Sequence, residues 1–320
     1  YQPPIAAAGE SSGGFFANVQ VGSEIHSPKR LLEGVSVGSQ QQWFARDSTV
    51  DKWEGGVWNI VTTGVVGANP SHCSDAAPGP FTTVDETPTV SEKPYLTIAP
   101  DGKFSLQVPP LKKNSRGADF DTKGTMTIPF ENVYVTDPKD SAATINAKLA
   151  AGLHVVITPG IYMLDSPLVV ATKGQVVLGL GLATLVASKQ NALIQVGNVD
   201  GVRIGGLLLQ AGPPAGSIVS PALIQWGAPG STYAGDAAAP GFLQDVFARV
   251  GGPDGASSSP VGATTMIEIN NGNVIGCVHA HATGCQPLVV PPAHLAFRTL
   301  NFAIGTISGS GARTTARPGR

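Results

Sequence analysis

The segment Val176-Val-Leu-Gly-Leu-Gly181 is the clearest of several short aliphatic runs that decide the fold. Comparable runs begin at Val155, Val202 and Leu243, so the offsets are 21 residues (155 to 176), 26 (176 to 202) and 41 (202 to 243). The longest offset leaves room for an inserted loop. Offsets of this size match the length of one turn in a protein whose repeats stack on one another.

These four segments belong to a longer series of β-like runs, which Gly, Pro, Asp or Asn separate. The runs are His154–Thr158, Pro167–Val170, Gln175–Leu178, Thr184–Ala187, Ala192–Val196, Val202–Gln210, Leu223–Trp226, Phe242–Val250 and Met266–Ile269. Their spacing is too tight for helical crossovers between parallel strands, and the turn pairs of antiparallel hairpins are largely absent. We therefore predict an all-β fold, a right-handed parallel β-helix whose turns each contribute two or three short strands.

A short helix is predicted immediately before these runs, over residues 140–152. Ala142, Ile145 and Leu149 recur at helical spacing, a polar capping residue precedes them, and Gly152 is a typical stop. Such a helix would cover the open N-terminal end of the coil and its unpaired strand edge. We assign residues 131–276 to the β-helix.

Residues 1–130 form a segment punctuated by Gly, Ser and Pro, with short β-like runs at Gly56–Thr63 and Tyr95–Ile98. We expect irregular β structure here. The composition turns polar near Lys112–Asp121, which indicates a loop or a soft boundary. The chain thus divides into a β-rich N-terminal segment (1–130), the β-helix (131–276) and a tail (277–320).

The composition excludes several classes of protein. The 40 glycines and 26 prolines make 66 of 320 residues, which disfavours an all-helical fold. Charged residues are 13% and hydrophobic ones 42%, which disfavours a disordered chain. A net charge of −2 gives no electrostatic reason to expect nucleic acid or an anionic membrane as partner, and no apolar run approaches the ~18 residues of a membrane span.

The two ends of the chain carry their own signals. The first residue is Tyr1, which fits a mature chain that has lost a signal peptide, so we expect a secreted, extracellular protein. Glu268 is the last acidic residue, and the 52 positions after it (269–320) carry four arginines. We interpret residues 277–320 as an atypical basic tail, as expected for a truncated or frameshifted chain. A β-helix whose C-terminal end has no cap exposes strand edges, so we also predict self-association.

The stretch Asp140–Leu185 resembles the first coils of the pectate-lyase-like β-helix superfamily. The residues that carry this resemblance are the capping helix, an aliphatic strand, Thr158-Pro-Gly-Ile-Tyr162 and the Gly-x-Gly turn within Leu178–Leu185. A narrower resemblance, over roughly residues 35–276, is to secreted β-helix proteins related to the glycoside hydrolase family 55 exo-β-1,3-glucanases. It is carried by Ser39–Thr49, Gly56–Asn59, Glu92–Pro94 and Asn198–Leu208.

This resemblance implies a secreted carbohydrate-active protein, a glycoside hydrolase acting on β-1,3-glucan or a related wall polysaccharide. An alternative is a non-catalytic carbohydrate-binding or structural β-helix, a truncated and inactive form. A weaker alternative is a polysaccharide lyase with an Arg base, for which Arg203 and Arg249 lie on strands. Lyases of this kind often hold Ca²⁺ with clustered Asp residues, and no such cluster lies near them.

Glycoside hydrolysis ordinarily needs two carboxyl groups on either side of the scissile bond. On a β-helix these would lie at one outward position on adjacent turns. Asp245 and Glu268 are the predicted catalytic pair, because both lie inside β runs with apolar neighbours and alternation points them outward. The alternative for each is an ordinary solvated face. Asp200 is a candidate substrate-binding residue, although Asp-Gly is also a common turn signature.

Two further residues are candidates for substrate binding. Trp226, in Ile-Gln-Trp-Gly, could stack on the apolar face of a sugar ring; the alternative is an aromatic side chain packed under a loop. Arg249 lies on a predicted strand, and the alternative for it is a side chain that covers apolar surface.

No metal or cofactor is expected. Cys277, His279, His281 and Cys285 are four potential zinc ligands within nine residues, but structural zinc sites pair two short chelates across a longer loop. The spacing leaves two alternatives open. The first is a Cys277–Cys285 disulfide, which would leave Cys73 free, and the second is that these residues form no bond. The Gly-x-Gly turn lacks the third glycine and the helix of a dinucleotide site.

Overall fold

The computed structural model describes residues 14–21, 26–27, 30–31, 35–37, 43–51, 53–55, 60–71, 81–212, 218–249 and 262–276. These residues form 24 strands, one α-helix and one 3-10 helix. The all-β class predicted from the sequence is therefore confirmed. Within the described ranges, no helix is long and apolar enough to cross a membrane.

The largest sheet contains the four aliphatic runs that decided the prediction. Its strands follow the order β14 (Val133–Val135), β15 (His154–Ile157), β18 (Val176–Ala187), β20 (Arg203–Gln210), β22 (Gly241–Arg249) and β24 (Val274–Gly276), and β16 (Ile161–Leu164) pairs with the second half of β18. Every pairing in this sheet is parallel. Each run thus lies beside the run one turn further along the chain.

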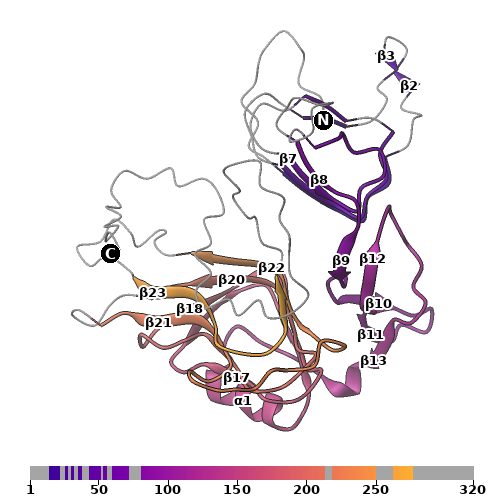
Figure 1. The fold of residues 1–320 in the computed structure, drawn as a ribbon. Helices are drawn as coiled ribbons and strands as arrows, with labels where there is room; N and C mark the ends of the chain where they lie inside the picture. The colour runs from indigo at the N-terminus through magenta and orange to yellow at the C-terminus, as the bar shows by residue number, and fades with distance from the viewer. Residues whose placement is uncertain are drawn as a thin grey trace, which may run out of the picture.

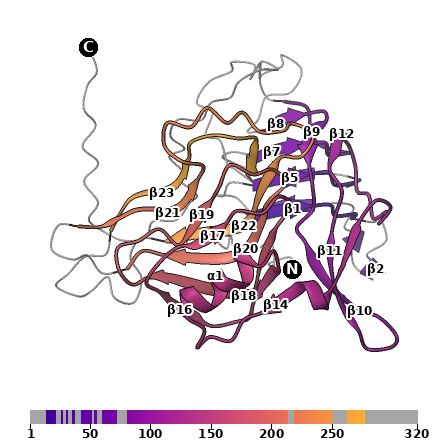
Figure 2. The same cartoon turned by 90° about the horizontal axis from the view of Figure 1, so that it is seen from below.

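A second parallel sheet contains β17 (Leu168–Val170), β19 (Ile194–Val196), β21 (Ser220–Trp226) and β23 (Ala263–Ile269). From β16 to β24 the chain alternates strictly between the two sheets, which lie against each other in Figures 1 and 2. This pairing of successive turns is the one predicted for a parallel β-helix. The right-handed closed coil stays a prediction.

Aliphatic side chains fill the space between these two sheets. The cluster includes Val155, Leu185, Ile204 and Ile224, all fully buried. Burial of this kind stabilises the fold by about 25 cal/mol for each Å² of apolar surface removed from water. The scarcity of charged residues follows, because each strand has one face in this core.

The predicted capping helix is confirmed as α1 (Ala142–Ala150). Ser141 is its N-cap, and its side chain accepts a hydrogen bond from the Thr144 backbone N–H at 3.1 Å. Ile145 and Leu149 are buried in the core between the sheets. Gly152 follows the helix with a φ of +83°, the left-handed conformation that ends many helices.

The N-terminal segment is more regular than the sequence suggested. Strands β1 (Gly14–Ala17), β5 (Trp43–Arg46), β7 (Ile60–Thr63) and β8 (Phe81–Val84) form a four-stranded parallel sheet. It has its own core, in which Phe16 packs against Trp43 and Trp53. The expectation of irregular β structure was therefore wrong for these strands.

The remaining strands belong to small sheets. Two of these are β2 (His26–Ser27) with β3 (Arg30–Leu31), and β4 (Val35–Val37) with β6 (Trp53–Gly55). An antiparallel pair joins β9 (Thr87–Val90) to β12 (Lys112–Ser115), and an antiparallel sheet contains β10 (Tyr95–Ile98), β11 (Phe104–Val108) and β13 (Met126–Pro129). The short 3-10 helix η1 (Phe130–Asn132) leads into β14.

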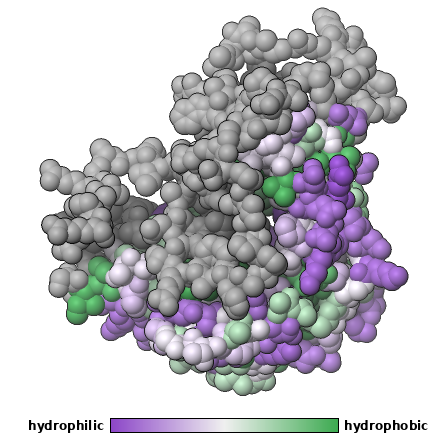
Figure 3. Space-filling view, viewed as in Figure 1, coloured by the Kyte–Doolittle hydropathy of each residue, from purple (hydrophilic) through white to green (hydrophobic). Residues whose placement is uncertain are grey.

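The β10–β11–β13 sheet covers part of the outer face of the largest sheet. Leu106 and Ile128 pack against Val156, Val176 and Leu178. The visible face of the β9–β13 region, on the right in Figure 3, is mostly hydrophilic. Residues on both sides of position 130 share this cluster, and the division of the chain at 130/131 stays a prediction.

Candidate functional site

Three neighbouring strands of the largest sheet, β18, β20 and β22, each have a left-handed residue at matching positions of the register. Gly206 in β20 has a φ of +68° and lies beside Asp245 in β22, whose φ is +54°, because the residues on either side of them pair in register. Leu182, with a φ of +57°, lies in the corresponding bend of β18, where the register shifts. We call this row of left-handed residues the corner.

The corner requires glycine where the backbones approach most closely. A Cβ added to Gly206 would lie 2.3 Å from the carbonyl oxygen of Gly179, and a Cβ on Gly179 would lie 2.3 Å from the oxygen of Gly206. The next turn places Asp245 at the same position, and Asp tolerates the left-handed conformation better than most residues. The corner thus presents a carboxylate on the outer surface.

The segment between β9 and β10 crosses over this corner. Lys93 Nζ lies 2.5 Å from Asp245 Oδ2, and Gln244 Nε2 donates to the Ser91 carbonyl oxygen at 2.5 Å. The Lys93 side chain lies close over Gly205, where an added Cβ would be 3.2 Å from Lys93 Cγ. Two adjacent residues of β22 therefore hold this segment in place.

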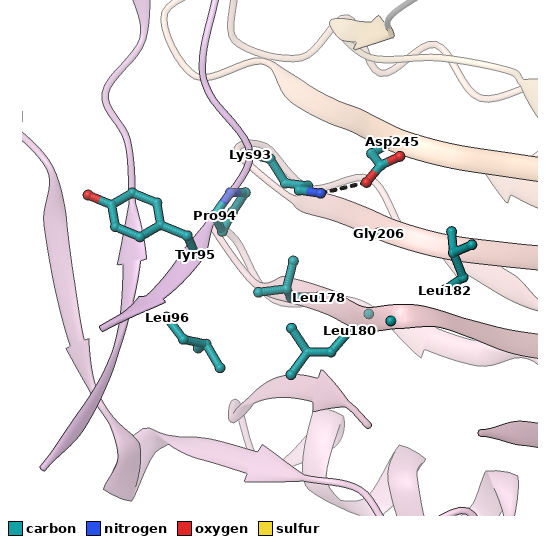
Figure 4. Close-up of a pocket in the computed structure, with 11 residues that line it drawn as sticks. Lys93, Pro94, Tyr95, Leu96, Leu178, Leu180, Leu182, Gly206 and Asp245 are labelled. Carbon is teal, nitrogen blue, oxygen red and sulfur yellow. Dashed lines mark hydrogen bonds and ion pairs between the residues drawn. The ribbon is translucent and has the colours of Figure 1, made fainter. Parts of the chain in front are cut away.

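A hollow of about 420 Å³ lies between this segment and the corner (Figure 4). Its lining is Lys93, Pro94, Tyr95, Leu96, Leu178, Gly179, Leu180, Gly181, Leu182, Gly206 and Asp245. We call it the corner pocket. Four leucines supply apolar surface, and the Lys93–Asp245 pair supplies the charged groups. Apolar walls with a few placed polar groups are typical of small-ligand sites.

The Lys93–Asp245 pair remains accessible to solvent. The side chains are 41% and 58% exposed, respectively. Solvent screens such a pair, so its contribution to stability is small, about 0–1 kcal/mol. Its effect is to orient the Asp245 carboxylate toward the pocket, where Figure 4 shows both charged groups above the leucines.

The same segment is held on its other side by the N-terminal sheet. Arg46 donates two hydrogen bonds to the Glu92 carboxylate, at 2.7 and 2.8 Å, and a third to Asp47 at 3.2 Å. Ser115 Oγ donates to Asp47 Oδ1 at 2.7 Å. Bidentate Arg–carboxylate pairs are among the strongest hydrogen-bonded pairs in proteins. Glu92 and Lys93 thus connect the N-terminal sheet to the corner pocket.

The two predicted catalytic carboxylates are not brought together. Asp245 lies on β22, whereas Glu268 lies on β23 in the other parallel sheet and does not line the corner pocket. Glu268 Oε2 accepts from Gln225 Nε2 at 3.0 Å, and Gln225 in turn accepts from Gln195 at 3.1 Å. The expectation that the pair shares one outward position on adjacent turns was wrong, because successive runs alternate between sheets. A catalytic role for each carboxylate stays a prediction.

Trp226 is not available as a sugar platform. Its side chain belongs to the core between the sheets and is 2% exposed. The ring packs so closely against Gly241 that an added Cβ there would lie 2.2 Å from it. The expected stacking role was therefore wrong, and the alternative of a packed aromatic side chain is correct.

Asp200 lies in a turn before β20. Its Oδ1 accepts a hydrogen bond from the Asp236 backbone N–H at 2.9 Å. A hydrogen bond from the Tyr233 hydroxyl, and then the one from Asp236, lower the pKa of Asp200 below its usual value. The carboxylate therefore holds the loop that follows β21, a contact that the sequence did not indicate, and its role in substrate binding stays a prediction.

The two arginines of β20 and β22 differ in their surroundings. Arg203 is 8% exposed, its guanidinium lies 4.0 Å from the centre of the Phe242 ring, and burial lowers its pKa to about 10. A buried, stacked guanidinium is poorly placed to act as a lyase base. Arg249 donates a hydrogen bond to Gln210 on the neighbouring strand, on the same outer face as Asp245.

Two residues near the pocket, Lys93 and Phe247, were not predicted as site residues from the sequence. Lys93 belongs to Glu92-Lys-Pro94, which entered only as part of a resemblance. Phe247 follows Asp245 by two residues and precedes Arg249 by two, and the alternation of β22 places all three on the outer face. That alternation was visible in the sequence.

In the described part of the chain, no group of three His, Cys, Asp or Glu side chains could hold a metal ion. Cys73, Cys277, His279, His281 and Cys285 lie outside the described residues, so the disulfide and zinc alternatives for them stay predictions.

Known proteins resemble this chain in sequence and in structure. Residues 133–282 match the model of the LAM55 pectate lyase-like domain. An exo-beta-1,3-glucanase of Streptomyces sp. (strain SirexAA-E / ActE) is 38% identical over 270 residues, which are 83% of this chain and 40% of that protein.

Two solved structures of sacteLam55A from Streptomyces sp. SirexAA-E share 38% identity with the chain. One, a variant in complex with glucose, has a TM-score of 0.73 and aligns over 85% of this chain and 45% of its own. The other has a TM-score of 0.69 and aligns over 82% and 44%. The chain therefore spans less than half the length of these relatives.

Proposed function

We propose that this chain, which has a pectate-lyase-like fold related to that of glycoside hydrolase family 55, takes part in the hydrolysis of β-1,3-glucan. The observation that carries the proposal is the 38% identity, over 83% of the chain, to a protein named as an exo-beta-1,3-glucanase. Glucose in the complex of the related structure supports a sugar ligand. The expected product is glucose released from a glucan chain.

The corner pocket is the proposed glucan-binding site. Sugar rings combine apolar C–H faces with hydroxyl groups, and the pocket offers leucine side chains beside an oriented ion pair. Asp245 accepts hydrogen bonds as a carboxylate, and Lys93 donates them as an ammonium. Hydrolysis requires a second carboxyl group, which must come from outside the lining of this pocket.

A non-catalytic glucan-binding protein is the second candidate. Two observations favour it: Asp245 is the one carboxylate among the described residues that line the pocket, and the chain spans 40% of the glucanase. This candidate predicts binding without turnover. It keeps the corner pocket as the binding site and removes any catalytic role of Asp245.

Binding and turnover of laminarin, a soluble β-1,3-glucan, separate the two candidates. Reducing-sugar release and binding in an affinity gel would be measured for the purified chain, for Asp245→Asn and for Glu268→Gln. Asp165→Asn, an exposed carboxylate outside the pocket, is the matched control. Release that falls only in Asp245→Asn supports hydrolysis at the corner pocket. Binding without release supports the second candidate, and neither binding nor release would overturn the proposal.

We further propose that the protein acts outside the cell, where wall glucan is found. Cell fractionation tests this location, and a purely intracellular protein would contradict it. Self-association through the C-terminal end of the β-helix stays a prediction of the sequence. Light scattering of the purified chain tests it, and a monodisperse monomer would contradict it.

A further inference from the structure

The outer face of the largest sheet carries an apolar surface beyond the corner. Register places Ile161, Thr184, Leu208 and Phe247 in one row across β16, β18, β20 and β22. Ile161 is 66% exposed and Phe247 is 48% exposed, and the two residues between them are partly exposed. Four strands at a spacing of about 4.8 Å make this row about 14 Å long.

A second row lies beside the first, two residues further along the same strands. It consists of Met163, Val186, Gln210 and Arg249. Met163 is 58% exposed, and Arg249 donates a hydrogen bond to Gln210. Val186 and Gln210 are buried, so Met163 and the partly exposed Arg249 are the accessible members of this row. The Arg249 guanidinium therefore supplies hydrogen-bond donors two residues beyond Phe247 on the same strand.

This surface is continuous with the corner pocket. Leu182, which is 58% exposed, lines the pocket and lies two residues before Thr184 of the first row. Asp245 also lines the pocket, and it lies two residues before Phe247 on the same outer face. We call the accessible residues Leu182, Thr184, Leu208, Phe247 and Arg249 the platform. A ligand can extend from the pocket onto the platform along the strands.

We propose that the platform binds a second stretch of the glucan chain whose other part occupies the corner pocket. This inference rests on the proposed function. The exposed Phe247 ring is suited to the C–H face of a sugar, and the Arg249 guanidinium is suited to donate hydrogen bonds to its hydroxyl groups. Exposed apolar surface that adjoins a pocket commonly marks a binding site.

The mixture of side chains favours a saccharide over a protein partner. Thr184 interrupts the apolar row and Arg249 borders it, so apolar and hydrogen-bonding groups alternate over short distances. The core of a protein interface is depleted in charged residues. A sugar chain presents its C–H faces and hydroxyl edges at a similarly short spacing.

Binding of saccharides of different lengths to the purified full chain tests the platform. A long chain reaches both the pocket and the platform, whereas a disaccharide fills the pocket alone, so wild type should bind laminarin more tightly than laminaribiose in isothermal titration calorimetry. Phe247→Ala should weaken laminarin binding about threefold to tenfold, the range for loss of an aromatic contact, with a smaller effect on laminaribiose. Phe247→Trp should restore the affinity.

Phe120→Ala is the matched control, because Phe120 is 63% exposed and lies outside the platform; its laminarin affinity should equal that of wild type. Circular dichroism establishes that each variant is folded. Equal affinity of wild type for the two saccharides, or unchanged laminarin binding in a folded Phe247→Ala variant, would overturn the platform. So would a dimer that Phe247→Ala dissociates while laminarin binding stays the same.

The result also separates this inference from the proposed function. If no variant releases sugar but Phe247→Ala loses laminarin affinity, hydrolysis by this chain is wrong and the platform stands. If sugar is released and Phe247→Ala binds as wild type does, the platform is wrong and hydrolysis stands.

Discussion

Lys93 and Asp245 lie 152 positions apart in the sequence and form an ion pair of 2.5 Å at the edge of the corner pocket. The pair exists because Asp245 occupies a left-handed position that is glycine one turn earlier, at Gly206. Backbone geometry therefore decides which carboxylate of this chain meets the segment that crosses the corner.

Asp245→Asn should separate the chemistry of the pocket from its stability. Asn also tolerates the left-handed conformation, and the exposed ion pair contributes little, so we expect the free energy of unfolding to change by less than about 1 kcal/mol. If Asp245 acts in hydrolysis as an acid or base, glucose release should fall about 100-fold or more. A folded variant with release within a factor of about two of wild type would remove Asp245 from the chemistry.

Gly206→Ala should destabilise the corner. The left-handed conformation alone costs a residue with a Cβ about 1–2 kcal/mol, and here the Cβ would also lie 2.3 Å from a carbonyl oxygen. We expect a total loss of about 3 kcal/mol or more in urea unfolding. Gly102→Ala is the control, since Gly102 has a φ of +82° with nothing within 4 Å. Equal losses in the two variants would show that close approach at the corner is unimportant.

Tyr162→Phe tests the hydrogen bonds of the first turn. The Tyr162 side chain is fully buried, and its hydroxyl lies 2.7 Å from Thr136 Oγ1 and 2.8 Å from Thr158 Oγ1. Removing it leaves buried polar groups with fewer partners, which should cost about 1–2 kcal/mol in the free energy of unfolding. Tyr95→Phe, at a side chain 39% exposed, should change it by less than about 0.5 kcal/mol. A neutral Tyr162→Phe would contradict this account.

His154 should make stability depend on pH. Burial lowers its pKa from the usual 6.5, and its Nδ1 accepts a hydrogen bond from the Val176 backbone N–H at 3.1 Å. The unfolded chain therefore binds a proton first as the pH falls below about 6.5, and stability should decrease from there down through the lowered pKa of the folded state. One such proton gives a slope of at most about 1.4 kcal/mol per pH unit.

His154→Asn is the variant for this measurement, because Asn retains an acceptor near the position of Nδ1 and does not titrate. Its free energy of unfolding should vary less between pH 6.5 and pH 5 than that of wild type. Identical pH profiles would show that another group is responsible.

Much of the fold was predictable because strong aliphatic runs recur at the length of one turn. The runs at Val155, Val176, Val202 and Leu243 became neighbours in one sheet, and the helix at Ala142–Ala150 ended where Gly152 predicted. The N-terminal parallel sheet was not predicted. Its strands have only four residues each, and their partners lie 29, 17 and 21 positions away (14 to 43, 43 to 60, 60 to 81), too irregular to indicate a repeat.

The site was predictable only in part. Alternation correctly placed Asp245 outside, but it could not show that Glu268 belongs to the other sheet or that Trp226 points into the core. A left-handed residue interrupts the alternation within a strand, so the side chains of the adjacent residues Gln244 and Asp245 both lie on the outer face of the sheet. Such a residue is hard to recognise in a sequence when it is not glycine.

The most direct test of the central claim is the time course of glucose release from laminarin by the purified chain, with Asp245→Asn beside it. Hydrolysis at the corner pocket predicts steady release of glucose by wild type and a rate at least about 100-fold lower in the folded variant. The absence of release by wild type, or equal release by both proteins, would contradict the claim.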